Sequence, residues 1–253
     1  MILDKFKLDG KVAIVTGSST GLGQGICYSF AEAGAKVVGI DYVESPETQA
    51  KIDSMGGEFI SIVANLMTID PIQSIVDATI AKFGKVDLLV NNAGIIRRED
   101  AIDFSEKNWD DVININQKTV FFFSQAVAKK FIEQGTGGKI INIASMLSFQ
   151  GGIRVPSYTA SKSAVMGITR AMANEWAKHN INVNAIAPGY MATNNTAALR
   201  ADEQRSEAIL DRIPAGRWGT PDDLQGTAVF LASPASDYVN GYTVAVDGGW
   251  LAR

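Results

Sequence analysis

The sequence contains almost none of the residues that build disulfides, cysteine-based metal sites and histidine-based catalytic sites. Among its 253 residues there are one cysteine, Cys27, and one histidine, His179. No disulfide can form within the chain, and we expect no metal site, because zinc is usually held by several cysteines and histidines. With a single histidine, acid–base chemistry is expected to use other side chains.

Long apolar runs and an excess of one charge are missing as well. No segment reaches the roughly 18–20 apolar residues that cross a bilayer, and the N-terminus lacks the apolar core and the cleavage site of a signal peptide. The 23 basic and 27 acidic residues leave a formal net charge of −4, which does not favour bulk binding of nucleic acid. The sequence therefore predicts a cytoplasmic protein with no membrane and no nucleic-acid partner.

Short β-branched runs alternate with longer helical stretches along the chain. This alternation predicts an α/β fold, a doubly wound parallel sheet with helices on both faces. The strand segments lack polar–apolar alternation, as expected for strands covered on both sides. We expect one domain over residues 1–253. The expected strands are 11–16, 36–40, 59–63, 88–91, 139–143, 182–186 and 243–246, and the expected helices include 21–33, 71–83, 119–134, 158–179 and 221–232.

One polar stretch interrupts this alternation of strands and helices. Residues 193–216 have helical propensity and lie between a predicted strand and a predicted helix. Loops that follow strands often carry binding residues, and some of them close over substrates. We therefore expect a substrate lid around residues 190–216.

A glycine-rich turn follows the first predicted strand. It reads Thr16-Gly17-Ser18-Ser19-Thr20-Gly21-Leu22-Gly23 and opens the first predicted helix. Backbone N–H groups and the helix dipole at such a position favour a pyrophosphate, and glycines let it approach. We interpret the turn as a dinucleotide-binding site, and an ordinary tight turn is the alternative.

Asp41 ends the second predicted strand, 24 residues after Gly17. A carboxylate there can accept hydrogen bonds from both hydroxyls of the adenosine ribose, and it repels a 2′-phosphate. No lysine or arginine occupies residues 18–20 or 42, so the sequence favours NAD over NADP as the cofactor. An aspartate that merely terminates a strand is the alternative. The motif Asn91-Asn92-Ala93-Gly94 ends the fourth predicted strand and suits packing beside a cofactor at the same sheet edge.

Three side chains form the predicted catalytic site. Tyr158 and Lys162 are four residues apart on one predicted helix and share a face. A lysine cation beside a phenol lowers the pKa of the phenol from about 10, which would let Tyr158 exchange a proton near neutral pH. Ser145 follows the fifth predicted strand and is expected at the same sheet edge. Taken alone, Tyr158 and Lys162 would be interpreted as two residues on an exposed helix face, which is the alternative. The accompanying motifs favour a catalytic pair instead.

Together these motifs resemble the short-chain dehydrogenase/reductase family over essentially the whole chain. The resemblance rests on the motifs at 16–23 and 91–94, on Asn116 within 113–116, on Ser145, Tyr158 and Lys162, and on 188–189 and 247–249. It implies a Rossmann fold, a homotetramer and hydride transfer between a nicotinamide and a CH–OH group. In such an assembly, subunit association is expected to bury Trp250 and Leu251 of the C-terminal tail.

The resemblance also implies a role for individual residues. Tyr158 would exchange a proton with the substrate oxygen, and Ser145 would hold that oxygen. Lys162 would bind the nicotinamide ribose and lower the pKa of Tyr158, and Asn116 would keep a water in a proton relay. The family usually has aspartate where this chain has Asn65, whose amide oxygen can still accept a hydrogen bond from adenine. The residues implied to bind the cofactor are Gly17, Ser19, Gly21, Leu22, Gly23, Asp41, Asn65, Leu66, Asn92, Ala93, Gly94, Tyr158, Lys162, Pro188, Gly189 and Thr193, of which Thr193 would reach the carboxamide.

The segments 142–158, 187–195 and 97–101 resemble a bacterial subgroup of that family. Its members reduce a deoxy-keto sugar acid with NADH in uronate (pectin-type) breakdown, so the resemblance implies such a substrate. Arg97, Arg98 and Arg154 lie in these segments, and arginine binds a carboxylate through two hydrogen bonds. Arg154, just before the Tyr158 helix, is expected to clamp the substrate carboxylate. For each arginine a surface charge or a subunit-interface pair is the alternative. The full set of substrate candidates is Arg154, Arg97, Gln150, Met146 and Tyr190.

Other functions stay open at this point. A related enzyme could act on gluconate or reduce a 3-ketoacyl carrier thioester, although the latter would usually use NADPH, which Asp41 disfavours. A catalytically silent, NAD-sensing protein is a candidate of another class. Such a sensor would have no need of the tuned phenol that Ser145, Tyr158 and Lys162 together suggest.

Overall fold

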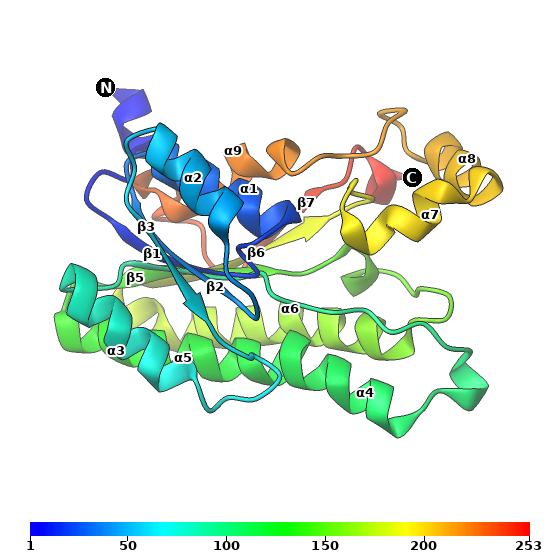
Figure 1. Ribbon diagram of the computed structural model, residues 1–253, viewed down its shortest axis with the longest axis horizontal. Helices are drawn as coiled ribbons and strands as arrows, with labels where there is room; N and C mark the ends of the chain where they lie inside the picture. The colour runs from blue at the N-terminus through cyan, green and yellow to red at the C-terminus, as the bar shows by residue number, and fades with distance from the viewer.

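The computed structural model describes residues 1–253, and at its centre is a parallel sheet of seven strands (Figure 1). The strands lie in the order β3-β2-β1-β4-β5-β6-β7. Because β1 pairs with both β2 and β4, the winding of the chain reverses between β1 and β4, the position where doubly wound folds bind ligands. The predicted α/β, Rossmann-type sheet is confirmed. The strands are β1 (Val12–Thr16), β2 (Lys36–Asp41), β3 (Phe59–Val63), β4 (Leu88–Asn91), β5 (Gly138–Ile143), β6 (Ile181–Pro188) and β7 (Thr243–Val246).

Helices cover both faces of this sheet. Figure 1 shows α1, α2 and α9 on one face and α3, α4, α5 and α6 on the other. Each layer has its own apolar cluster, with Phe30 of α1 in one and Phe123 and Phe131 of α5 in the other. Burial of these side chains is the main force that holds the layers to the sheet. The α-helices are α1 (Gly21–Glu32), α2 (Pro46–Ser54), α3 (Ile72–Phe83), α4 (Glu106–Ile113), α5 (Thr119–Gln134), α6 (Pro156–Trp176), α7 (Ala197–Ala201), α8 (Glu203–Arg212) and α9 (Asp222–Ala232).

Central and edge strands differ in burial. Every residue of β1 and β4 is buried, whereas the edge strands β3 and β7 leave several residues accessible. Central parallel strands are covered by helices on both sides, which explains their continuous valine, isoleucine and leucine content. None of the helices combines the length and the apolar character that crossing a membrane requires.

A chain of buried polar side chains crosses the sheet. Asn91 on β4 donates from Nδ2 to Asn142 Oδ1 on β5 at 2.9 Å, and Asn142 Nδ2 donates to Thr169 Oγ1 on α6 at 2.9 Å. The Asn91 nitrogen also donates to Ser124 Oγ on α5 at 2.9 Å. All four residues are buried, so these bonds satisfy groups that water cannot reach. These hydrogen bonds between buried side chains thereby link α5, β4, β5 and α6.

Residues 190–216 carry α7 and α8, which project beside the carboxyl ends of the strands (Figure 1). The expected helical character of this segment is confirmed. Backbone hydrogen bonds close its base, since Ala192 N donates to Gly219 O at 2.7 Å and Gly219 N donates to Tyr190 O at 2.9 Å. We call residues 190–216 the lid segment below.

The C-terminal residues depart from the expectation. The carboxylate of Asp247 accepts hydrogen bonds from the N–H groups of Gly249 at 2.9 Å and Leu251 at 2.8 Å, and the tail folds into a 3₁₀ turn, Trp250–Ala252. Trp250 is therefore 4% exposed within its own chain and packs against Tyr190 at 4.8 Å between ring centroids. The expectation that subunit association buries Trp250 is wrong.

Candidate active site

The carboxyl ends of the strands border a cavity of about 320 Å³. Ser145 and Tyr158 both line it, together with the loop 150–155 and with residues of the lid segment. Ligands of doubly wound sheets bind at this edge, where several strand ends present side chains together. The structure therefore brings Ser145 and Tyr158 together at the wall of one cavity, whereas Lys162 and Asn116, the other two residues of the predicted catalytic set, do not line it.

Helix α6 places Tyr158 and Lys162 on one face. It begins at Pro156, whose fixed φ suits the first turn of a helix. Lys162 is 5% exposed, and its Nζ lies 5.6 Å from the centre of the Tyr158 ring and donates to Ile143 O at 2.6 Å. Burial lowers the pKa of Lys162 to about 8. The ammonium form therefore still predominates at neutral pH.

The pKa of Tyr158 moves in the direction opposite to the expectation. Burial raises it, and the hydrogen bond with Ser145 and the positive charge of Arg98 offset this only in part. The expected lowering by Lys162 is absent, because the ammonium group is directed to the Ile143 carbonyl. The phenol is consequently protonated at neutral pH and can donate its proton.

Ser145 directly follows β5, where the chain enters the 3₁₀ turn Met146–Ser148. Its Oγ accepts a hydrogen bond from Leu147 N at 3.1 Å, and its own N–H donates to Ser148 Oγ at 3.2 Å. Ser148 Oγ in turn donates to the backbone carbonyl of Lys162 at 2.6 Å. These bonds fix Ser145 relative to α6, and Ser145 and Tyr158 line the same cavity.

A π-helical turn, Asn114–Lys118, places Asn116 under the segment that follows β4. Such turns inside helices occur often at functional sites. Asn116 is fully buried, its Oδ1 accepts from Ile95 N at 2.9 Å, and its Nδ2 donates to Ile95 O at 2.9 Å and to Ser161 Oγ at 3.2 Å. Both N–H groups of the side chain are used, so it joins the Ile95 segment to α6 and has no free N–H for a relay water.

The glycine-rich turn fits a bound pyrophosphate. Gly17 has a φ of 71°, which glycine adopts without strain. A Cβ at Gly23 would overlap the Gly17 carbonyl oxygen and the Asn92 side-chain nitrogen, so only glycine allows this approach. Helix α1 begins without a capping side chain and without an acidic residue in its first turn. Its first N–H groups therefore have no side-chain partner and can bind an anion.

Residues after β4 hold this turn in place. Asn92 Nδ2 donates to Thr16 O at 2.9 Å and to Gly17 O at 3.2 Å. Thr16 Oγ1 accepts from the backbone N–H groups of Asn92 and Ala93, each at 2.9 Å. The predicted motif thus joins the ends of β1 and β4, whereas its first residue, Asn91, points into the core.

Asp41 lies at the end of β2 with a largely buried carboxylate, 8% exposed. Its Oδ2 accepts from Ser19 N at 2.9 Å and from Ser19 Oγ at 2.7 Å, and its Oδ1 accepts from Tyr42 N at 2.7 Å. An ionised carboxylate has about four acceptor positions, so it can still accept from a ribose diol. Residues 17–24 and 41–47 contain no lysine or arginine and include Glu44 and Glu47. This surrounding fits a ribose without a 2′-phosphate.

The expected nicotinamide-side residues lie along the same edge. A Cβ at Gly21 would lie 3.6 Å from Thr193 Cγ2, so Thr193 sits over the first turn of α1. Pro188 ends β6, and the next residue, Gly189, lines the cavity. The start of the lid segment therefore meets the glycine-rich turn.

The residues expected to contact adenine, Asn65 and Leu66, already have partners within the chain. Asn65 follows β3 and is exposed, and its Oδ1 accepts from Met67 N at 3.0 Å. Leu66 is buried in the apolar core. Contact with adenine through Asn65 would have to share the oxygen that Met67 already uses.

One of the predicted substrate residues is placed elsewhere. Arg97 does not line the cavity and instead faces Asp111, with 3.6 Å between Nη2 and Oδ2. Arg98 lines the cavity in its place and donates from Nη2 to the Asn195 carbonyl at 3.2 Å. Neighbouring residues of an extended segment point to opposite sides, which explains why only one of the two reaches the site.

The other four substrate candidates, Arg154, Gln150, Met146 and Tyr190, do line the cavity. Arg154 has a positive φ of 64°, which is unusual for a residue with a side chain. Its Nε lies 2.9 Å from Asp100 Oδ1, and its carbonyl accepts from Glu99 N at 3.1 Å. Its charge is thus already paired at the cavity mouth.

The cavity lining that the sequence did not predict includes Arg205, Arg212 and Trp250. Both arginines come from α8, and Trp250 comes from the C-terminal turn. The signal for the arginines was their spacing of seven residues, which places them on one helical face. No local pattern indicated that Trp250 folds back to the site.

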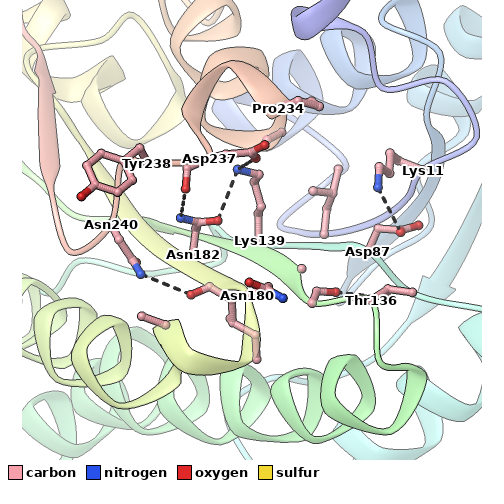
Figure 2. Close-up of a pocket in the computed structure, with 16 residues that line it drawn as sticks. Lys11, Asp87, Thr136, Lys139, Asn180, Asn182, Pro234, Asp237, Tyr238 and Asn240 are labelled. Atoms are coloured by element: carbon pink, nitrogen blue, oxygen red, sulfur yellow. Dashed lines mark hydrogen bonds and ion pairs between the residues drawn. The ribbon is translucent and has the colours of Figure 1, made fainter.

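A larger cavity of about 800 Å³ lies at the opposite, amino edge of the sheet (Figure 2). Its charged side chains neutralise one another, with 3.5 Å between Lys11 Nζ and Asp87 Oδ1 and 2.8 Å between Lys139 Nζ and Asp237 Oδ1. It contains none of the predicted catalytic residues. The smaller cavity at the carboxyl edge is therefore the candidate active site.

Known proteins resemble this chain over its length. A family model described as Enoyl-(Acyl carrier protein) reductase matches residues 17–251. Proteins named 2-dehydro-3-deoxy-D-gluconate 5-dehydrogenase from Dickeya dadantii and Escherichia coli are 72% and 71% identical over 253 residues, with 100% of each chain covered. The crystal structure of a gluconate 5-dehydrogenase from Burkholderia cenocepacia in complex with NADP and tartrate is 39% identical, with a TM-score of 0.95 and 100% of each chain covered.

Proposed function

The chain belongs to the short-chain dehydrogenase/reductase family of oxidoreductases, and we propose that it interconverts a ketone and a secondary alcohol on a deoxy-keto sugar acid with NAD(H). The proposed reaction type is that of a 2-dehydro-3-deoxy-D-gluconate 5-dehydrogenase, which would serve uronate breakdown. The observation that carries the proposal is the cavity itself, where Ser145 and Tyr158 meet four arginines and no acidic residue. Such a lining suits a small anion that carries a ketone.

Tyr158 is the proton donor in the proposed reduction. Its raised pKa keeps the phenol protonated at neutral pH, and the proton passes to the ketone oxygen as the carbon receives a hydride. The hydroxyl of Ser145 holds the same oxygen by a hydrogen bond. Lys162 donates to the Ile143 carbonyl at 2.6 Å and thereby holds α6 against the end of β5, which positions Tyr158 at the cavity.

The cofactor is held by residues along the same edge. The glycine-rich turn binds the pyrophosphate, Asp41 binds the adenosine ribose, and Lys162 binds the nicotinamide ribose. Thr193 and Gly189 border the nicotinamide, which when bound supplies or accepts the hydride. The negative charges of Asp41, Glu44 and Glu47 disfavour a 2′-phosphate, which supports NAD, although the Burkholderia cenocepacia relative was crystallised with NADP.

A substrate panel tests this function. The protein is mixed with deoxy-keto sugar acids, 5-ketogluconate, a 3-ketoacyl thioester and neutral ketoses, each with NADH and with NADPH. We expect the highest kcat/KM for a deoxy-keto sugar acid with NADH. Preference for the thioester or for NADPH would refute the substrate or the cofactor assignment, respectively. Dinucleotide binding without turnover of any compound would point to a sensor.

The role of Tyr158 is tested by Tyr158→Phe. The variant keeps the ring and loses the proton, so turnover should fall roughly 10²- to 10⁴-fold. Binding of NADH, followed by fluorescence titration, should change little. Tyr238→Phe, at a fully exposed tyrosine, is the matched control and should retain wild-type turnover. Retained turnover in Tyr158→Phe would refute the proposed role.

A further inference from the structure

The positive charges of the cavity are not equivalent. Its charged lining residues are all arginines: Arg98, Arg154, Arg205 and Arg212. Arg154 is paired with Asp100 at 2.9 Å, and Arg98 donates to a backbone carbonyl at 3.2 Å. The guanidinium groups of Arg205 and Arg212 have neither a hydrogen-bond acceptor nor an acidic partner within the chain. They are therefore the two cavity cations whose side chains have no partner within the chain, so all of their N–H groups can bind an anion.

Helix α8 presents both of these groups to the cavity. Residues seven positions apart on a helix differ by about 20° around its axis, so Arg205 and Arg212 share a face. Ile209 lies between them on that face and is buried in a cluster with Met146 and Trp250. Burial of Ile209 thus sets the rotation of α8 and directs the arginines to the site.

Trp250 fixes the orientation of Arg212. The guanidinium carbon of Arg212 lies 4.0 Å from the centre of the indole ring, within the range of a cation–π contact. The indole is itself held edge-on by Tyr190, at 4.8 Å between ring centroids, and Tyr190 packs on Trp218 at 5.4 Å. A guanidinium stacked by its face keeps its N–H edge available, which is the edge that binds a carboxylate.

We propose that Arg205 and Arg212 bind the substrate carboxylate from the lid segment, and that Trp250 is a positioning residue for Arg212. This inference rests on the proposed function, and it assigns the two ends of the substrate to different parts of the chain. Ser145 and Tyr158 bind the ketone oxygen, and the two arginines of α8 bind the carboxylate. Arg154, the carboxylate clamp expected from the sequence, is replaced in that role because its charge is already paired with Asp100.

The test compares a keto acid with its methyl ester, which keeps the carbon skeleton and removes the charge. In Arg205→Met and Arg212→Met, KM for the acid should rise roughly 10- to 100-fold, the range for losing a hydrogen bond to a charged group. KM for the ester and kcat for both compounds should change little. Arg212→Lys keeps the charge without the stacked plane and should fall between wild type and Arg212→Met. Arg170→Met, which removes an exposed arginine of α6, is the matched control.

Trp250→Leu tests the positioning role, because leucine stays apolar but offers no π face. Its KM for the acid should rise about 3- to 10-fold, and the double variant with Arg212→Met should be no worse than Arg212→Met alone. Calorimetric binding of D-gluconate to the NADH complex should weaken in the same order, and thermal melts check that each variant is folded. Equal losses for acid and ester would overturn the clamp and leave the proposed function intact. A wild-type protein that reduces no keto acid would overturn both.

Discussion

Replacing Asn116 with alanine should destabilise the protein and disturb the substrate cavity. The side chain is fully buried and makes three hydrogen bonds, two to Ile95 and one to Ser161. Each such bond contributes about 0.5–1.5 kcal/mol net, so their loss should cost about 3 kcal/mol. The cavity left by the truncation adds to this cost.

The expected loss is measurable as a shift in Tm. For a chain of this size, 1 kcal/mol corresponds to about 2–4 °C, so Asn116→Ala should lower Tm by about 6–12 °C. Ile96 and Arg98 follow Ile95 and line the cavity, so KM for the keto acid should rise as well. A merely local loss of stability would leave KM unchanged.

The assay is thermal unfolding followed by circular dichroism, together with steady-state kinetics. Asn114→Ala is the matched control, because Asn114 lies in the same π-helical turn and its side chain makes no hydrogen bond. That variant should stay within about 1 kcal/mol of wild type, the common range for a single substitution. If both variants melt at the same temperature, the hydrogen bonds of Asn116 do not contribute the expected amount of about 3 kcal/mol to the free energy of unfolding.

Three other predictions concern the proposed nicotinamide ribose site, the glycine-rich turn and the base of the lid segment. Binding of NADH should weaken as pH rises through about 8, because Lys162, which is proposed to bind the nicotinamide ribose, has a pKa that burial lowers to about 8 and loses its charge there; an NADH affinity that stays flat through this range would contradict this. Gly23→Ala should weaken NADH binding in a fluorescence titration, because the new methyl group displaces the backbone of the turn, whereas Gly226→Ala, with open space in α9, should not. Asp223→Asn should lower the free energy of unfolding at neutral pH by about 1 kcal/mol. Arg217 holds the pKa of Asp223 well below its usual range, so the stabilisation is present above that range and is lost as pH falls, and urea denaturation of wild type and variant should converge in acid.

Much of the fold could be predicted because local signals agree with the global arrangement. The valine and isoleucine run of β1 stops at Thr16, before a glycine, and β3, β4 and β7 have the bounds that their sequences predict. The pairing of Tyr158 with Lys162 follows from their spacing on any helix. These features depend on near neighbours in the chain.

The features of the candidate site that could not be predicted depend on contacts between segments that are distant in the sequence. The choice between Arg97 and Arg98 is made by the lid segment, whose Asn195 carbonyl lies 97 residues further along the chain than Arg98. The direction of the pKa shift of Tyr158 follows from burial by the whole fold, which outweighs the nearby charges. Trp250 reaches the cavity because Asp247 folds the tail back, and the sequence pattern around it shows only an apolar residue near the end.

The buried amides between β4 and β5 have a consequence for the alignment of the active site. A slip of one residue between these strands would turn Asn142 to the opposite face of the sheet and leave Asn91 and Thr169 without their partner. Each buried polar group left unpaired costs about 1–3 kcal/mol, so the slipped pairing would forfeit a large share of a typical folding free energy of about 5–15 kcal/mol. Asn92 and Ser145 come one and three residues after these two asparagines, so the core contact sets how far each strand end extends. The positions of the glycine-rich turn and of Ser145 along their strands are thus set by a hydrogen bond in the core, away from the cavity.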